Sequence, residues 1–275
     1  MTDETRSNDP SSDPTAAPAA LDIPPGPPPQ PIRWRRAVRE LRALIAEPDE
    51  THHAIDLVYA LGTREFERNF QRLLASAQGR ALLAERPSLL AALSDRASLS
   101  SLADDSLGRA YLAYLDRNRF EPDGLLEVQA RVGERWEREE NVPPLDAFRA
   151  WFRDRNLLAH DLFHVLTDYG TDDLGEATLL AFSLAQVGGR AQTLLTVGAA
   201  IEVTRALGWR WIRYVLGAWR RGRRAAWLVA LPWEELLPLR LTTVRRLAGV
   251  CEANEVHPGG VLRGTIDERR VFTPA

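Results

Sequence analysis

The chain has 275 residues, of which 45% are hydrophobic and 27% are charged, so it is long enough to bury a large core as a soluble globular protein. Its net charge of −3 and its pI near 6.0 show no overall excess of basic residues, so we expect no nucleic-acid partner. Cys251 is the single cysteine and lysine is absent, which excludes an internal disulfide, a cysteine-rich zinc finger or iron–sulfur cluster, and lysine-dependent chemistry.

Residues 1–31 are rich in proline, serine, alanine and aspartate and carry few large apolar side chains. Such a segment cannot bury enough surface to offset the entropy that is lost on ordering, so we expect a disordered tail. The segment lacks the basic start and the apolar run of a secretory signal, and its acidic residues argue against an organelle transit peptide. A bacterial cytoplasmic protein is the simplest setting.

Helices are predicted throughout the region that follows. Apolar side chains recur at helical spacing over residues 33–94, and strand-like alternation hardly appears. A further helix is expected after Asp105 and Ser106, either of which can cap it by accepting a backbone N–H bond. The predicted fold class is therefore all-α.

The segment from Phe148 to Asp168 is predicted to form one buried helix, because apolar residues lie on nearly every side of it. At about 100° per residue, His160, Asp161 and His164 fall on one arc roughly a quarter-turn wide. A short turn follows, and a second helix is expected to begin near Glu176. The reversal of the chain would bring Glu176 back beside the first helix.

Two imidazoles and two carboxylates in this arrangement predict a site for zinc, manganese, iron or cobalt with an open position for a further ligand. The short side chain of Asp161 suits a ligand or an orienting group better than the general base found between paired histidines in H-E-x-x-H proteases. Two alternatives stay open, namely that Glu176 forms a capping box with Asp173 and that the histidines are satisfied core residues. We favour the metal, because burying these polar groups in an apolar helix is costly unless something neutralises them.

Residues 177–200 are apolar around the whole predicted helix, except for Gln186, the pair Gly188 and Gly189, and Arg190. These interruptions indicate a core helix and not a membrane span, because a span needs about twenty consecutive apolar residues. This helix could also line an apolar tunnel beside the metal.

The stretch 203–233 contains no acidic residue, and its arginines alternate with tryptophan and tyrosine. This composition is typical of an interfacial helix on anionic lipid, so we predict contact with a membrane surface through residues 205–227. Nucleic-acid surfaces share this composition, but the overall acidity of the chain favours lipid. The alternative is a solvated arginine face over a tryptophan-rich core. Residues 251–275 are expected to be a polar tail in which His257 is exposed.

The sequence HDLFHVLTDYGTDDLGE, in which H-D-x-x-H is followed by eleven residues and a glutamate, resembles the signature of the ubiquinone (coenzyme Q) biosynthesis protein 4 family. Further similar segments are Gly79–Leu83, Leu107–Tyr111 and Trp233–Leu236, and the resemblance spans about residues 60–250. It implies a mostly helical protein that binds a polyprenylated substrate and associates with membranes and with other ubiquinone biosynthesis proteins.

The resemblance also implies a divalent metal, usually taken as zinc, bound by His160, Asp161, His164 and Glu176. The expected reaction removes the carboxylate of a polyprenyl hydroxybenzoate intermediate and places a hydroxyl on the same carbon, as in an oxidative decarboxylase. Asp168 is a candidate for orienting a ligand from outside the metal's own shell. The alternatives are a non-catalytic lipid-binding scaffold that organises the biosynthetic enzymes and, more weakly, an unrelated metal-dependent hydrolase.

The expected layout is a tail over 1–31, a single helical domain over 32–250 with a metal site between two helices joined by a short turn, and a tail over 251–275. The oligomeric state is left open, with a homodimer among the options. The expected location is the cytoplasm, in peripheral association with the inner face of the cell membrane.

Overall fold

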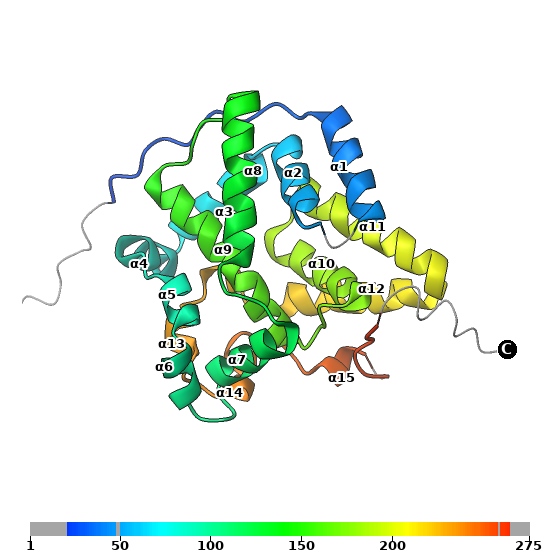
Figure 1. Ribbon diagram of the computed structural model, residues 1–275. Helices are drawn as coiled ribbons and strands as arrows, with labels where there is room; N and C mark the ends of the chain where they lie inside the picture. Colours follow the sequence, from blue (N-terminus) through cyan, green and yellow to red (C-terminus); the bar gives the residue numbers. More distant parts are fainter. Residues whose placement is uncertain (1–20, 48–49, 258, 265–275) are drawn as a thin grey trace, which may run out of the picture.

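All regular structure in the computed structural model is helical over the residues that it describes, which are 21–47, 50–257 and 259–264 (Figure 1). The all-α prediction is therefore confirmed, and the one strand-like contact in these residues is an isolated antiparallel bridge between Ser106 and Arg240. The elements are α1 (Trp34–Ala46), α2 (His52–Leu61), α3 (Arg64–Ala75), α4 (Ala77–Glu85), α5 (Leu89–Ser94), α6 (Arg96–Ser101), α7 (Leu107–Asn118), α8 (Gly124–Glu140), α9 (Ala147–Thr167), α10 (Asp173–Val187), α11 (Arg190–Leu207), α12 (Arg210–Arg224), the 3₁₀ helix η1 (Leu228–Ala230), α13 (Trp233–Leu236), α14 (Leu241–Leu247) and α15 (Ala253–Val256).

Helix α9 lies in the middle of the molecule and carries both histidines of the predicted site (Figure 1). It begins at Ala147, where the carboxylate of Asp146 accepts hydrogen bonds from two backbone N–H groups of the first turn. It ends at Thr167, because Asp168 has a left-handed φ of 63° that interrupts the helical hydrogen bonding. The predicted helix from Phe148 to Asp168 is thus confirmed to within one residue at each end.

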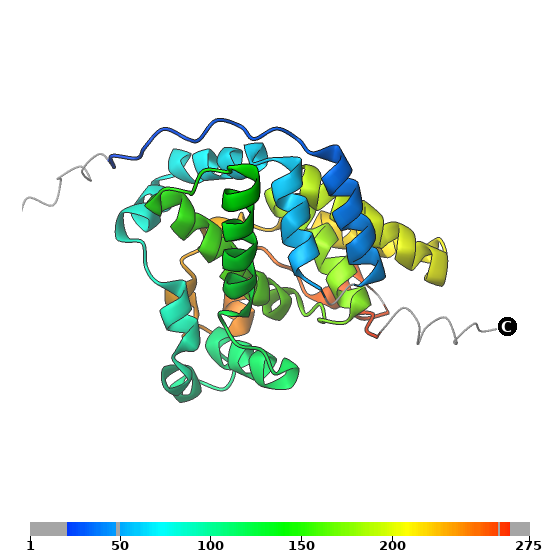
Figure 2. The same cartoon turned by 45° about the horizontal axis from the view of Figure 1, so that its top comes forward.

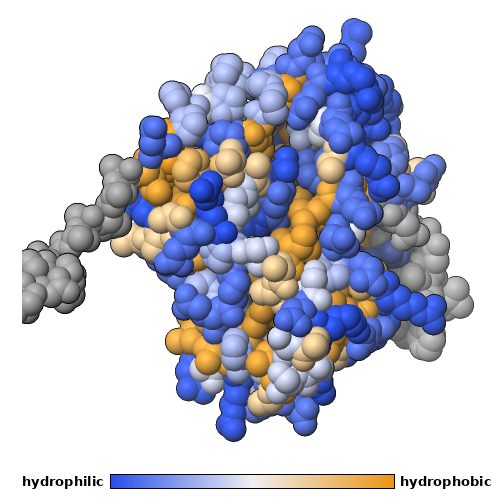
Figure 3. All heavy atoms as spheres, turned by 60° about the vertical axis from the view of Figure 1, so that its left-hand side comes forward, coloured by the Kyte–Doolittle hydropathy of each residue, from blue (hydrophilic) through white to orange (hydrophobic). Residues whose placement is uncertain are grey.

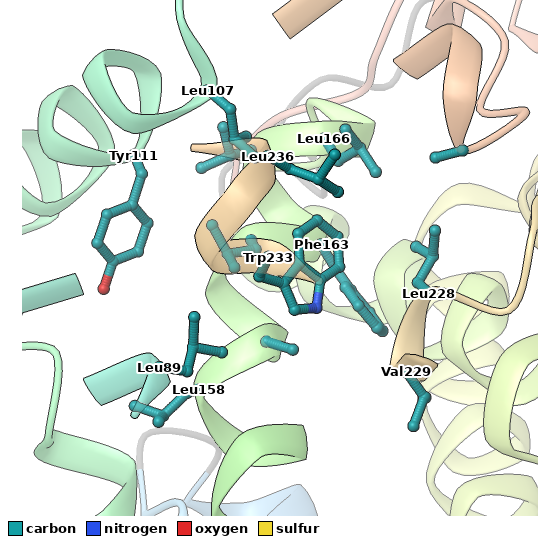
Figure 4. Close-up of a cluster of buried hydrophobic side chains, with 14 of the residues drawn as sticks. Leu89, Leu107, Tyr111, Leu158, Phe163, Leu166, Leu228, Val229, Trp233 and Leu236 are labelled. Carbon is teal, nitrogen blue, oxygen red and sulfur yellow. The ribbon is translucent and has the colours of Figure 1, made fainter. Parts of the chain in front are cut away.

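One side of α9 is buried in the main hydrophobic core. Phe163 packs against Trp233 with ring centroids 6.2 Å apart, and Leu166 and Leu236 belong to the same cluster (Figure 4). Helices α5, α7, α8, α10 and α14 all contact α9. On another side of α9, Asp161 contacts Tyr114 of α7 and the two histidines face Glu176 of α10.

A second core lies among α1, α2, α8 and α11, and Figure 2 shows α1 and α2 side by side. The indole N–H of the buried Trp136 donates to the carboxylate of Asp56 at 2.7 Å, and the Arg36 guanidinium lies 4.0 Å over the indole ring. Glu40 lies on the buried side of α1, where its carboxylate pairs with His53 at 2.9 Å. The packed side of α1 therefore includes a charged network, whereas its other side faces outward.

A short turn joins α9 to α10, as predicted, and α10 begins three residues before the expected start at Glu176. The carboxylate of Asp172 caps α10 by accepting from the backbone N–H of Gly175 at 3.0 Å. A Cβ atom at Gly175 would lie only 2.1 Å from the carbonyl oxygen of Gly170. This close approach requires glycine, and it sets the distance between the turn and the first residues of α10.

The apolar segment 177–200 is divided into α10 and α11 by Gly188 and Gly189, both of which have positive φ angles. Helix α10 is held against α12 by a hydrogen bond of 2.6 Å from the Gln186 amide to the carbonyl of Gly222. No helix in the described part of the chain is long and apolar enough to cross a membrane. The prediction that 177–200 forms a helix of the core is therefore confirmed for α10, whereas α11 is partly exposed.

The basic stretch 203–233 does not form one continuous surface. Trp209 is 80% exposed, whereas Trp211 is 2% and Arg221 is 1% exposed. The Arg221 guanidinium donates to the carbonyl oxygens of Thr167 and Cys251 inside the protein. The stretch therefore has some residues in the core and others exposed to solvent, and contact of the exposed residues with lipid stays a prediction.

The ends of the described chain pack against the helical core. Leu21 and Ile23 contact the main core, and the Pro24 carbonyl accepts a hydrogen bond from Arg149 at 3.0 Å. The prediction of a disordered tail falls largely on residues 1–20, which lie outside the described residues, as do 258 and 265–275. His257 was expected to be exposed, but that prediction is wrong because its ring is 3% exposed and contacts aromatic rings of the core.

Candidate metal centre

Three donor side chains meet between α9 and the first turn of α10. They are His160, His164 and Glu176, and one ligand atom of each lies within 4.8 Å of those of the other two. Glu176 Oε1 is 3.1 Å from His164 Nε2, and Glu176 Oε2 is 4.0 Å from His160 Nε2. The carboxylate therefore faces both imidazoles across the space between the two helices.

Local structure explains this convergence. His160 and His164 are four residues apart in α9, so their rings project from the same side on successive turns. Asp172 is the N-cap of α10, and the third helical position, which completes a capping box, is occupied by Gly175. Glu176 therefore does not close a capping box with Asp173, and this alternative explanation of its position is wrong.

The buried ring of His164 is oriented by the backbone. Its Nδ1 lies 3.0 Å from the carbonyl oxygen of Tyr169, which can only accept, so Nδ1 carries the proton and Nε2 has the free lone pair. Although His164 Nε2 is close to Glu176 Oε1, these two atoms form no hydrogen bond. His160 Nδ1 also lacks a hydrogen bond among the described residues. Buried polar atoms without a partner are rare in folded proteins, so the donor set fits a bound cation.

Asp161 lies beside this group and not in it. Its Oδ1 accepts a hydrogen bond of 3.3 Å from the Tyr114 hydroxyl and is 3.6 Å from His160 Nδ1. A carboxylate next to the second nitrogen of a ligating histidine commonly fixes the orientation of the ring. The structure thus brings three of the four predicted ligands together, and direct ligation by Asp161 stays a prediction.

The charges around the site favour a cation. Burial lowers the pKa of His160, but the attraction of the nearby Asp161 and Glu176 carboxylates outweighs it and leaves the pKa raised. Burial raises the pKa of Glu176, but attraction to the protonated forms of His164 and His160 outweighs it and leaves the pKa lowered. The two carboxylates that stabilise an imidazolium in this way would stabilise a metal cation by the same attraction.

Two tyrosines of α7 adjoin the site, and sequence reasoning did not assign them to it. Tyr114 stacks on His164 with ring centroids 5.7 Å apart, and Tyr111 is fully buried with no hydrogen-bond partner for its hydroxyl among the described residues. Burial and the charge of Asp161 raise both pKa values well above their usual range, so both hydroxyls stay protonated. In the sequence, only their spacing of three residues, which places both on one side of a helix, could have indicated that they lie together.

The orienting role predicted for Asp168 is wrong. Its carboxylate pairs with Arg263 at 2.9 Å on the protein surface, and the contact that orients His164 comes from the Tyr169 carbonyl.

Two imidazoles and one carboxylate match a three-ligand site that keeps an open coordination position. The side chains of His160 and Glu176 are partly exposed, so such a position would be accessible from outside.

Comparison with known proteins identifies relatives along most of the chain. A sequence model of the family described as "Coenzyme Q (ubiquinone) biosynthesis protein Coq4" matches residues 36–132 and 145–254. Similar proteins include a mitochondrial ubiquinone biosynthesis protein coq4 from Pyrenophora tritici-repentis, 28% identical over 71% of this chain and 65% of the relative. The COQ4 homologue of Danio rerio is 30% identical over 59% of this chain and 56% of the relative, and that of Mus musculus is 28% identical over 71% and 70%.

The matched region spans less than two thirds of the length of the first two of these relatives. Among solved structures, the chain is similar to a putative ubiquinone biosynthesis protein from Nostoc punctiforme, with a TM-score of 0.57 and 18% identity over 80% of this chain and 99% of that one. At this identity the similarity shows a shared fold only. All four predicted ligands lie inside the region that the family model matches.

Proposed function

The chain belongs to the coenzyme Q (ubiquinone) biosynthesis protein Coq4 family, and on this basis we propose that it acts on a polyprenyl hydroxybenzoate intermediate of ubiquinone biosynthesis at a metal held by His160, His164 and Glu176. The observation that carries this proposal is the buried Nε2 of His164, which faces Glu176 and has no hydrogen bond. Zinc is the expected ion, with manganese, iron or cobalt as alternatives.

When bound, the ion would supply Lewis acidity that stabilises negative charge on a phenolate or carboxylate oxygen. The protein's own groups would hold the site in shape. The Tyr169 carbonyl keeps the proton on His164 Nδ1, and Asp161 is placed to do the same for His160 Nδ1. The hydroxyl of Tyr114 is a protonated donor at the edge of the site, within reach of Asp161.

The proposed reaction replaces the ring carboxylate with a hydroxyl group. It releases carbon dioxide and removes two electrons from the substrate, so it needs an oxidant such as dioxygen in addition to the prenylated benzoate. The test is to supply purified protein with its native metal, the prenylated hydroxybenzoate and dioxygen, and to measure carbon dioxide and the hydroxylated product. His164→Ala and Glu176→Ala should abolish both metal content and product, whereas Glu121→Gln, at an exposed glutamate outside the site, should change neither.

A second candidate function is a non-catalytic lipid-binding scaffold that presents the intermediate to other ubiquinone biosynthesis proteins. The exposed apolar face described below favours it. The same assay separates the two functions, because a scaffold would bind the prenylated benzoate without turning it over even when dioxygen and metal are present. Normal metal content and normal quinone production in a Glu176→Ala strain would contradict the metal-dependent function.

We propose further that the protein associates peripherally with a membrane through a surface that includes α1. Trp34, Val38 and Ile45 are 56%, 45% and 43% exposed and form one stripe along this helix. The exposed side chains of Arg35, Arg39 and Arg42 flank the stripe, whereas Glu40 points inward. An apolar stripe with an interfacial tryptophan and a border of arginines is typical of helices that lie on anionic lipid.

Helix α11 contacts α1 and adds exposed Val197 and Ile201. We call these two residues, together with Trp34, Val38 and Ile45, the α1–α11 face. In Figures 1 and 2, α1 and α11 lie at the end of the molecule opposite α4. Figure 3 shows the side nearer α4, where hydrophilic residues and smaller hydrophobic groups are interspersed.

The proposed membrane contact therefore includes α1 in addition to the exposed part of stretch 205–227, from which Trp211 and Arg221 must be left out because they are buried. A cytoplasmic location at the inner face of the cell membrane stays a proposal, since the relatives compared above carry mitochondrial names. We also propose that the protein binds other ubiquinone biosynthesis proteins and forms a homodimer.

A further inference from the structure

The C-terminal segment folds back onto the turn that follows the ligand His164. The imidazole of His257 stacks on Tyr214 with ring centroids 3.8 Å apart, and its Nε2 is 2.9 Å from the Tyr169 hydroxyl. Both His257 and Tyr169 are almost completely buried. A segment expected to be a polar tail thus makes a hydrogen bond inside the protein, close to the candidate metal centre.

Tyr169 connects this segment to the ligand. Its backbone carbonyl accepts the hydrogen bond from His164 Nδ1, and its side-chain hydroxyl bonds to His257. The backbone N–H of the same residue donates to the Thr167 hydroxyl at 3.4 Å. The position of the carbonyl therefore depends on how firmly the Tyr169 side chain is held, because the residue lies in a turn and not in a helix.

The neighbouring turn residues are held from the same direction. Arg221 donates to the Thr167 carbonyl at 2.7 Å and to the Cys251 carbonyl at 2.6 and 2.9 Å. Arg263 donates to the Asp168 carbonyl at 3.1 Å. Each of the three residues 167, 168 and 169 is thus fixed by a side chain that comes after residue 220 in the chain.

The protonation states fix the direction of the bond between Tyr169 and His257. Burial, together with the positive charge of Arg221, lowers the pKa of His257 to about 4. Burial raises the pKa of Tyr169 to about 12, although the charge of Arg221 opposes it. Near neutral pH the phenol therefore donates and the neutral imidazole accepts.

We propose that Tyr169 and His257 are positioning residues of the metal centre, which hold the Tyr169 carbonyl where it directs His164 Nε2 toward Glu176. The proposal rests on the metal site proposed above. The match to the family model ends at residue 254, so His257 and Arg263 lie beyond it. The hydrogen bond between Tyr169 and His257 is therefore a feature of this chain that the family match does not supply.

The test measures the affinity of chelator-treated protein for Co²⁺ and the visible absorption spectrum of the cobalt-loaded protein. Tyr169→Phe keeps the ring and removes only the hydroxyl, and we expect it to weaken Co²⁺ binding about tenfold, the lower end of the range for groups that orient ligands. His257→Leu should weaken binding to the same extent. His257→Gln should restore most of it, because an amide oxygen can accept the phenol's hydrogen bond.

Tyr214→Phe is the matched control. It removes a hydroxyl from the same cluster that accepts from the backbone N–H of Leu262 at 2.9 Å and takes no part in the hydrogen bond between Tyr169 and His257. It should lower the Tm without changing Co²⁺ affinity or spectrum. The double variant Tyr169→Phe with His257→Leu should bind no more weakly than either single variant, because both remove the same bond.

The proposal is overturned if Tyr169→Phe and His257→Leu bind Co²⁺ with wild-type affinity and an unchanged spectrum. If Tyr169→Phe does not fold, the comparison between His257→Leu and His257→Gln decides. Equal metal binding by the wild type and His164→Ala would instead defeat the metal site itself, and this inference with it. Binding that His164→Ala loses but Tyr169→Phe retains would defeat the inference alone.

Discussion

His164 Nδ1 lies 3.0 Å from the carbonyl oxygen of Tyr169, five residues further along the chain. This bond spans the left-handed residue Asp168, which ends α9 and turns the backbone back toward the imidazole. The end of the helix and the orientation of a candidate ligand thus depend on the same few residues. Variants of the turn should therefore be tested for metal affinity as well as for stability.

Metal removal should lower the stability of the wild type but not that of a variant without the site. A ligand that binds only the folded state adds about 2.7 kcal/mol to the free energy of unfolding when its free concentration is 100 times Kd. Addition of a chelator should therefore lower the Tm of the metal-loaded wild type and leave that of Glu176→Ala unchanged. Thermal unfolding followed by circular dichroism measures both. Equal responses of the two proteins would contradict a site at Glu176.

Replacement of Asp161 distinguishes a ligand from an orienting residue. Asp161→Asn keeps an oxygen that can accept from Tyr114 and from His160 Nδ1 but removes the negative charge that makes the histidine a stronger ligand. An orienting role therefore predicts a loss of metal affinity of about 10- to 100-fold and retained 1:1 binding. A direct ligand predicts a larger loss and a changed Co²⁺ spectrum. Tyr114→Phe removes only the neighbouring hydroxyl and serves as the control. Titration calorimetry with Zn²⁺ provides the affinities.

Binding to anionic vesicles should depend on α1. The variant Arg35→Gln with Arg42→Gln removes two exposed charges, each worth about 1 kcal/mol near an anionic surface, so binding should fall by about 30-fold. Arg39 is left in place because its guanidinium pairs with Glu40 at 2.7 Å. Raising the salt concentration from about 0.1 M to about 1 M should weaken wild-type binding, because the Debye length falls from about 10 Å to about 3 Å. Co-sedimentation with vesicles that contain phosphatidylglycerol measures both effects.

Two triple serine variants test the apolar part of the same surface. Trp34→Ser with Val38→Ser and Ile45→Ser should also reduce vesicle binding. The control variant changes three exposed apolar residues elsewhere, Phe120, Leu239 and Leu247, to serine. Equal vesicle binding by the two serine variants and the wild type would show that the α1–α11 face is not the membrane contact.

His257 predicts a pH dependence of stability. Its pKa is lowered from 6.5 to about 4 in the folded protein, so the unfolded chain binds the extra proton between these values. This contribution to stability is present above pH 6.5, and it declines as the pH falls toward 4, with a total of up to about 3 kcal/mol. The wild type should therefore lose stability relative to His257→Gln as the pH falls from 6.5 to 4. Urea unfolding at several pH values measures it, and a constant difference would contradict the buried neutral imidazole.

Local patterns in the sequence determined the helical class, the extent of α9 and the placement of both histidines on one side of it. These features depend on residues a few positions apart, whose geometry in a helix is set by the backbone itself. The same reasoning predicted the short turn and the return of Glu176 toward α9. The cap residue was not predicted, because either of the two consecutive aspartates, Asp172 and Asp173, can accept the first N–H groups of a helix and only the folded turn selects Asp172.

Tertiary structure alone decided which groups surround the histidines and which charges are buried. Tyr114 reaches Asp161 across 47 positions of sequence, and Arg221 reaches the Thr167 carbonyl across 54. In the sequence, Arg221 looks the same as its exposed neighbours, and His257 looks like part of a polar tail. Burial of such groups depends on partners brought close by packing of distant helices, and no local periodicity encodes those partners. The sequence could therefore name the candidate ligands, whereas only the folded chain shows what holds them in place.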